Sequence, residues 1–219
     1  MQQEIIQTVD FISPQEARWW ADEVVAHHRH WTPRDKFYTL GAATYQDDPM
    51  NYRQVADEEN PVLLAGFTPL LAACYRQFGQ SFTTYHHPRG IALPGFHIFT
   101  PEASDLQGHI HIDEPWKFIT FPLIWHSPFS FTLPLQLPDG DGGMEYWPDI
   151  TEEELHAYTH NRIIPPPEYC EYEVGKMYIH TGNFHHRIAN RRGIGNGQLR
   201  ITLQGHGVTF EGGTKVLYF

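Results

Sequence analysis

The segment Gly108-His109-Ile110-His111-Ile112-Asp113 alternates polar and apolar side chains, and this alternation predicts an extended strand. Residues two apart on a strand point to the same side, so His111 and Asp113 can both reach one ion. Ile110 and Ile112 then turn into the opposite, apolar layer. The His-x-Asp pair therefore predicts part of a metal site, provided that another ligand comes from elsewhere in the chain.

A further histidine source lies far along the sequence, in Asn183-Phe184-His185-His186-Arg187-Ile188. With His111 and Asp113, it completes a set of two imidazoles and one carboxylate. Such a set is typical of ferrous sites that hold the ion on one face and leave three octahedral positions open. Most other histidines are expected to be ordinary surface or core residues, among them His27, His28, His30, His86, His87, His156 and His160.

Arg200 follows in the segment Gly197-Gln198-Leu199-Arg200-Ile201-Thr202. An arginine suits the binding of an acidic co-substrate, because its planar fork pairs with a carboxylate through two hydrogen bonds and keeps its charge. Thr202 shares the arginine's side of the predicted strand, so its hydroxyl can donate a further bond to the same carboxylate.

These residues, in this order, resemble those of the iron(II)- and 2-oxoglutarate-dependent oxygenases, over about residues 91–204. The resemblance is at the level of motifs and names no particular protein. It implies a double-stranded β-helix, which is a jelly-roll fold. The matching pieces are His111-Ile112-Asp113, the stretch from Leu135 to Pro148, Gly175-Lys176-Met177-Tyr178-Ile179-His180, His186-Arg187-Ile188 and Arg200-Ile201-Thr202.

The resemblance also implies a site and a reaction. His111, Asp113 and His186 would bind Fe(II), with no catalytic side chain beyond these ligands. Arg200 would pair with the distal carboxylate of 2-oxoglutarate, and Thr202 would assist it, as the family's Arg-x-Ser pattern suggests. The implied reaction consumes O2 and 2-oxoglutarate, releases succinate and oxidises a substrate C–H bond. Hydroxylation or desaturation is expected rather than halogenation, because related halogenases replace the carboxylate that this chain keeps.

Two ligand positions have a competing neighbour. His185 and His186 face opposite ways on a strand, so only one can enter the site. We choose His186, because the Arg187-Ile188 that follows it resembles the family's distal element. His109 shares the side of His111, but the two-residue offset to Asp113 belongs to His111. His109 is therefore expected to contact a metal ligand rather than the metal, or to face the substrate.

Length and composition suit one domain, since 219 residues with 41% hydrophobic content are enough for a single β-barrel or sandwich with a sizeable core. The expected fold is mainly β with flanking helices. Residues 1–80 would form a mostly helical N-terminal support, and residues 81–219 would form the double-stranded β-helix core.

Capping signals predict the helices. Ser13-Pro14-Gln15-Glu16 opens one that runs to about His28, and Asn60-Pro61 opens a second that ends near Gly79 and that Pro69 kinks or divides. Thr151 caps a short third helix. Strands are expected at about 37–45, 82–86, 91–99, 108–112, 117–124, 129–137, 144–147, 171–180, 185–189, 198–209 and 215–218.

Charge and cysteine content narrow the partners and the compartment. A net charge of −11 argues against nucleic acid, whose binding draws on a basic surface. Two cysteines cannot build a disulfide framework, and the start of the sequence lacks a secretory signal, so a cytoplasmic enzyme is expected. The most apolar window, residues 118–137, has the alternation of strands rather than a membrane helix. The oligomeric state stays open.

The substrate is expected to be a small molecule, such as a free amino acid or a natural-product intermediate. His97, Glu114, Trp116 and Trp147 are the candidate substrate contacts, because they offer charge and aromatic surface near the predicted mouth. Two other classes remain open. A cupin-like metal-dependent isomerase would use His109 and His111 as its first pair, but would need a later glutamate ligand. A non-catalytic metabolite-binding β-sandwich would be expected to have lost the triad.

Overall fold

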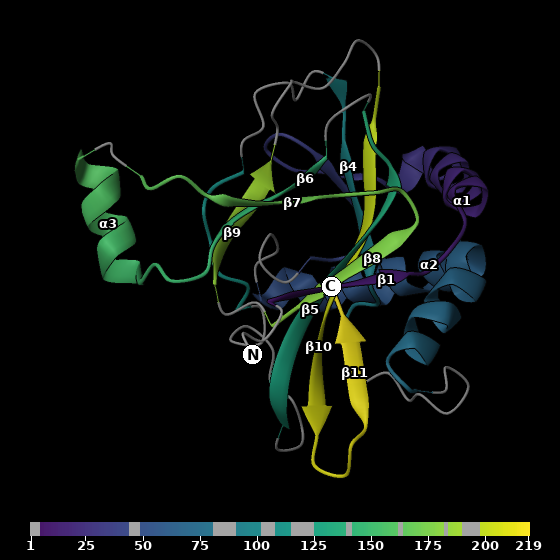
Figure 1. The fold of residues 1–219 in the computed structure, drawn as a ribbon. Coiled ribbons are helices and arrows are strands. Elements are labelled where there is room, and N and C mark those ends of the chain that lie inside the picture. The colour runs from purple at the N-terminus through teal and green to yellow at the C-terminus, as the bar shows by residue number, and fades with distance from the viewer. Residues whose placement is uncertain are drawn as a thin grey trace.

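The computed structural model describes residues 5–43, 49–80, 91–101, 108–114, 125–138, 142–161, 164–181, 184–189 and 198–219. Within these residues the chain forms a large and a small antiparallel β-sheet, with helices packed on the large one (Figure 1). The architecture is the mainly β fold with flanking helices that the sequence predicted.

The large sheet has the strand order β1-β8-β5-β10-β4-β3-β2, and β11 pairs with β10 beside this path. Strand β10 is the long central strand, bonded on one side to β5 and on the other to β4. The strands are β1 (Ile6–Asp10), β2 (Thr32–Pro33), β3 (Tyr38–Leu40), β4 (Gly95–Phe99), β5 (Trp125–Gln136), β8 (Lys176–His180), β10 (Arg200–Phe210) and β11 (Lys215–Tyr218).

The small sheet has the order β7-β6-β9, formed by β7 (Glu168–Glu171), β6 (Gly143–Trp147) and β9 (His185–Ala189). An isolated bridge joins His111 to His186 of β9. The two sheets meet in an apolar cluster that includes Ile6 of β1, Tyr178 of β8 and Met144 of β6. We call the face of the large sheet that is turned toward the small sheet its inner face.

Alternation along β10 assigns its side chains to two layers. Ile201 and Leu203 belong to the main hydrophobic core, on the helix side of the sheet. Arg200, two residues from Thr202, reaches carbonyl groups of the small sheet, so the even-numbered residues lie on the inner face. The inner face of β10 therefore carries Arg200, Thr202, Gln204 and His206, whereas its outer face is apolar.

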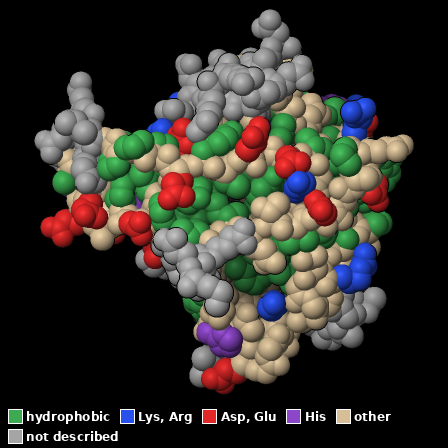
Figure 2. Space-filling view, viewed as in Figure 1, with side chains coloured by type: hydrophobic (Ala, Val, Ile, Leu, Met, Phe, Trp, Pro, Cys, Tyr) green, Lys and Arg blue, Asp and Glu red, His purple; other side chains and the backbone are tan. Residues whose placement is uncertain are grey.

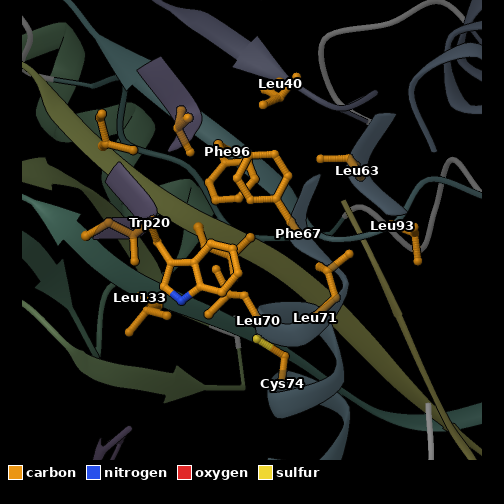
Figure 3. Packing of buried hydrophobic residues seen from close by; sticks show 14 of the residues in the cluster. Trp20, Leu40, Leu63, Phe67, Leu70, Leu71, Cys74, Leu93, Phe96 and Leu133 are labelled. Atoms are coloured by element: carbon orange, nitrogen blue, oxygen red, sulfur yellow. The ribbon is translucent and has the colours of Figure 1, made fainter. Parts of the chain in front are cut away.

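Two helices cover the outer face. Helix α1 (Pro14–Ala26) begins with the predicted capping box, in which Ser13 and Glu16 bond to each other's backbone N–H groups. Helix α2 (Pro49–Gln77) packs Phe67 and Leu71 against Phe96 of β4 and Leu133 of β5 (Figure 3). Burial of these aliphatic and aromatic side chains fixes the large sheet as a rigid platform.

Helix α3 (Glu152–Asn161) stands apart from the large sheet, at the left in Figure 1. Its first turn carries Glu152, Glu153 and Glu154, and Glu154 forms a capping box with Thr151 as predicted. Acidic side chains at this end are favoured by the unpaired N–H groups and the helix dipole. Figure 2 shows acidic side chains at the left edge of the molecule, where Figure 1 places α3. None of the helices in the described ranges has the length and apolarity that crossing a membrane requires.

The predicted start of the second helix was wrong. Helix α2 begins at Pro49, and it continues through Pro61 and Pro69 without being divided. Asn60 does not cap the helix, because its amide bonds instead to the backbone of residues 91–93: it donates to Ile91 O and accepts from Leu93 N–H. The side chain that the sequence predicted as a helix cap thus makes a tertiary contact instead.

Several strand predictions also need correction. Residues 108–112 form only the isolated bridge at His111, and the predicted strand 171–180 is interrupted before β8 by Gly175, whose φ is +87°. Strand β1 was not predicted. The predicted strands 82–86 and 117–124 lie outside the described residues.

Candidate metal centre

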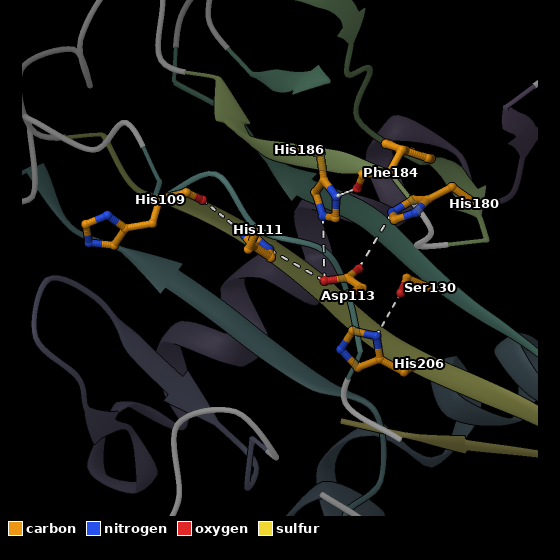
Figure 4. A network of polar contacts seen from close by, with 8 residues as sticks. All are labelled: His109, His111, Asp113, Ser130, His180, Phe184, His186 and His206. Atoms are coloured by element: carbon orange, nitrogen blue, oxygen red, sulfur yellow. Dashed lines mark hydrogen bonds and ion pairs between the residues drawn. The ribbon is translucent and has the colours of Figure 1, made fainter. Parts of the chain in front are cut away.

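His111, Asp113 and His186 converge into one cluster, in which a ligand atom from each lies within 4.8 Å of the others. Asp113 Oδ1 is 3.5 Å from His111 Nε2 and 3.6 Å from His186 Nε2 (Figure 4). The three come from two segments that are far apart in sequence. Their convergence is the arrangement that the sequence predicted for a metal site.

The backbone places the two imidazoles side by side. His111 N–H donates to His186 O at 3.0 Å, and His186 N–H donates to His111 O at 2.9 Å. Residues that exchange both hydrogen bonds in an antiparallel pair point to the same face. The ring centroids of His111 and His186 are accordingly 4.5 Å apart.

Hydrogen bonds select the ring nitrogen that each histidine offers. His111 Nδ1 lies 2.8 Å from His109 O, and His186 Nδ1 lies 3.0 Å from Phe184 O. A carbonyl oxygen only accepts, so each Nδ1 carries the hydrogen and donates it. Nε2 is the nitrogen that faces Asp113: it donates to the carboxylate while it is protonated, and it offers its lone pair to a cation once the proton has left. A hydrogen bond at Nδ1 of this kind orients a metal-binding imidazole.

The electrostatics of the cluster suit a cation. Burial alone would raise the pKa of Asp113, but the charge of His186 and hydrogen bonds from His111 and His186 hold it well below its usual range. Burial would lower the pKa of His111, yet its hydrogen bond to Asp113 raises it. An ionised carboxylate beside two aligned imidazoles is a donor set that fits a divalent transition metal. The side chain of His111 is 50% exposed, so the cluster is open on that side.

Three further histidines face this cluster from the inner face of the large sheet: His97, His180 and His206. Figure 4 shows His180 and His206 on two sides of Asp113. His180 Nε2 is 3.9 Å from Asp113 Oδ2, and His206 Nδ1 shares a 2.8 Å hydrogen bond with Ser130 Oγ. His180 and His206 were not predicted as part of the site. Both lie in predicted strands, and the alternation of side chains along 198–209 already placed His206 on the same side as Arg200.

Burial keeps these inner histidines neutral. It lowers the pKa of His97 to about 3, with help from His206 when that ring is protonated and from the charges of Arg200 and Arg34. It also lowers the pKa of His180 to about 3 and that of His206. Neutral imidazoles add hydrogen-bonding groups to the site without adding positive charge that would repel a metal ion.

We expect the metal-free protein to lose stability as the pH falls from about 6.5 toward 3. The pKa of an imidazole is about 6.5 in an unfolded chain, whereas burial lowers the pKa of folded His97 to about 3. Between these values the unfolded state binds more protons, so the free energy of unfolding falls by about 1.4 kcal/mol per pH unit for each such group. Urea unfolding from about pH 8 to about pH 5 measures this slope.

Two variants locate the origin of that slope. His97→Phe keeps an aromatic ring beside Phe37 and should make the free energy of unfolding depend less steeply on pH. His28→Gln replaces an exposed histidine and should leave this slope unchanged. Equal slopes in His97→Phe and the wild type would contradict the assignment.

Arg200 lies at the end of β10 and is only 5% exposed. Its Nη1 and Nη2 donate to Ala189 O and Gly143 O, both at 3.4 Å, and its guanidinium lies over the rings of Phe99 and Tyr172. Tyr172 was not predicted as part of this region. The arginine is thus held at a fixed, buried position against the small sheet.

Thr202 is fully buried on the same face of β10 as Arg200. Gln204 Nε2 donates to Thr202 Oγ1 at 3.2 Å, which leaves the hydroxyl hydrogen of Thr202 available for donation. This geometry is compatible with the predicted assistance to Arg200.

The structure separates the four candidate substrate residues. His97 lies on the inner face of β4 opposite Thr202, with Phe37 and Phe99 around its ring. Glu114 is half-buried and follows Asp113 directly. Trp147 is paired with His185 and lies under Arg187, on the side of β6 away from the triad. Trp116 is outside the described residues.

The competing histidines lie elsewhere. His185 Nδ1 donates to Ile150 O at 2.9 Å, so this side chain points away from the cluster. His109 is exposed, and its carbonyl oxygen accepts the bond from His111. His109 therefore touches the site through its backbone rather than its ring.

No protein-family model matches the sequence, and no curated protein does. Solved structures do match. An N-substituted L-amino acid dioxygenase from Burkholderia ambifaria AMMD superposes with a TM-score of 0.61 at 15% identity, over 98% of this chain and 86% of that one. Its complex with α-ketoglutarate gives a TM-score of 0.62 at the same identity and coverage.

These matches establish the fold. The chain adopts the same fold as this dioxygenase, the double-stranded β-helix that the motif resemblance implied. At 15% identity this likeness is one of fold, and the chemistry depends on the side chains of the site.

Proposed function

We propose that this protein is an Fe(II)- and 2-oxoglutarate-dependent dioxygenase that oxidises an unactivated C–H bond of a small molecule. The observation that carries the proposal is the cluster of His111, Asp113 and His186, with both Nε2 atoms turned toward one carboxylate oxygen. The amino acid dioxygenase of the same fold, solved with α-ketoglutarate, supports the choice of co-substrate.

In this proposal His111, Asp113 and His186 would hold Fe(II). With O2 and 2-oxoglutarate, the ion supplies the oxidising chemistry, in which decarboxylation of 2-oxoglutarate to succinate is coupled to oxidation of the substrate. Arg200 binds the distal carboxylate of 2-oxoglutarate through its planar fork. Thr202 donates its hydroxyl hydrogen to the same carboxylate. The buried position of both side chains excludes water and strengthens these bonds.

The proposed substrate is a small molecule such as a free or substituted amino acid. The rings of Phe37, His97 and Phe99 form an aromatic group on the inner face that can contact an apolar substrate side chain. The amino acid substrate class named for the similar structure supports this choice. Hydroxylation is the proposed outcome rather than halogenation, because this chain keeps Asp113 where related halogenases replace the carboxylate.

Anaerobic addition of Fe(II) and then 2-oxoglutarate tests the function. We expect a visible metal-to-ligand charge-transfer band after the second addition, and succinate after oxygen is admitted. A panel of free and N-substituted L-amino acids should then contain compounds that stimulate succinate release. A metal-dependent isomerase or a metabolite-binding sandwich would give neither the band nor succinate, and that result would reject the proposal.

A further inference from the structure

The two oxygens of Asp113 have different neighbours. Oδ1 faces both ligand imidazoles, at 3.5 Å from His111 Nε2 and 3.6 Å from His186 Nε2. Oδ2 points the other way, toward His180 Nε2 at 3.9 Å (Figure 4). The surroundings of the carboxylate therefore distinguish one oxygen directed at the metal position from one directed at the large sheet.

His180 is held firmly at this place. It is the last residue of β8, and its backbone is paired with Ile6 of β1 on one side and Ser130 of β5 on the other. Its ring packs at 5.1 Å from both Phe184 and His186, and its side chain is 3% exposed. A side chain fixed by two strands and two rings can hold a partner in one orientation.

The orientation of the carboxylate matters for the proposed chemistry. An aspartate can bind a metal ion through one oxygen or through both, and the second mode uses a coordination position that the co-substrate or O2 needs. An imidazole N–H directed at Oδ2 stabilises the mode in which only Oδ1 binds. Hydrogen bonds to a metal ligand from residues that do not touch the metal contribute about 10- to 100-fold to metal affinity.

We propose that His180 is a positioning residue that donates its Nε2–H to Oδ2 of Asp113, so that Asp113 binds the metal through Oδ1 alone. The inference rests on the proposed function, because it assumes that the triad holds a metal ion. The two atoms are 3.9 Å apart in the structure, which is longer than a hydrogen bond, so the proposal requires the imidazole and the carboxylate to move closer together when the metal binds.

Cobalt(II) binding to the purified protein tests this role without relying on turnover. His180→Leu removes the donor and keeps an apolar side chain in the buried position, and we expect its dissociation constant for Co(II) to rise by about 10- to 100-fold. His180→Gln retains an N–H donor and should stay within about threefold of the wild type. The visible Co(II) spectrum should change in His180→Leu only, because Oδ2 is then free to bind.

His206→Leu is the matched control. His206 is also a buried imidazole on the inner face, but its hydrogen bond goes to Ser130. If His206→Leu weakens Co(II) binding as much as His180→Leu, or if His180→Gln fails to restore it, the positioning role is wrong. If the wild-type protein binds neither Co(II) nor Fe(II), the proposed function itself fails. If the wild type and His180→Leu bind Co(II) equally, only the role of His180 is rejected.

Discussion

His186→Ala is expected to abolish iron retention. The substitution removes one of the two proposed imidazole ligands from a cluster whose ligand atoms lie within 4.8 Å of one another. Since outer contacts alone contribute about 10- to 100-fold to metal affinity, loss of a direct ligand should cost more than about 100-fold. Equilibrium dialysis against Fe(II) under anaerobic conditions measures the loss, and succinate formation should disappear with it.

His185→Ala provides the control for this result. The two histidines are neighbours on β9, but His185 bonds to Ile150 O and faces away from the triad. Its replacement should leave iron affinity nearly unchanged. Iron binding that survived in His186→Ala and was lost in His185→Ala would show that the ligand had been assigned one residue off.

Arg200→Ala is expected to weaken 2-oxoglutarate binding while sparing iron. Truncation of one partner of a buried, hydrogen-bonded charge pair costs about 2–5 kcal/mol, which corresponds to roughly 30- to 4,000-fold in affinity. Anaerobic titration of the Fe(II)-loaded protein, followed through the charge-transfer band, gives this dissociation constant. The dissociation constant of Arg200→Lys for 2-oxoglutarate should lie between those of the wild type and Arg200→Ala, because lysine keeps the charge but lacks the planar fork.

Arg187→Ala separates the specific effect from general loss of an arginine. Arg187 forms an ion pair with Glu145 and lies over Trp147, on the side of the small sheet away from the triad. Its removal should not change 2-oxoglutarate affinity. Unchanged affinity in Arg200→Ala, with iron bound normally, would remove Arg200 from the co-substrate site.

The sequence was most informative where alternation and chemistry coincided. The offset between His111 and Asp113 predicted that both side chains reach one point, and the structure places them there although residues 108–112 do not form a continuous strand. Parity along β10 likewise predicted that Arg200 and Thr202 share a face, and both are buried on it. Local spacing sufficed for these relations because each lies within one short segment.

Relations between segments were harder to predict. His180 could be placed on a strand, but its position beside Asp113 depends on the pairing of β8 with β5 and on the packing of one sheet over the other. The placement of Trp147 failed for the same reason, since the register of β6 against β9 decides which side of the sheet it occupies. Helix α2 was misread because Asn60 bonds to a distant segment rather than to its own helix.

The separation of side chains on β10 allows two properties to be engineered independently. Substitutions among Ile201 and Leu203 would alter packing against the helices, and so the melting temperature. Substitutions at Gln204, or at Thr132 opposite it on β5, would instead change the inner face, on which the proposed site lies. A library confined to such inward-facing positions could therefore search for new substrate preferences while leaving the thermal robustness of the scaffold largely intact.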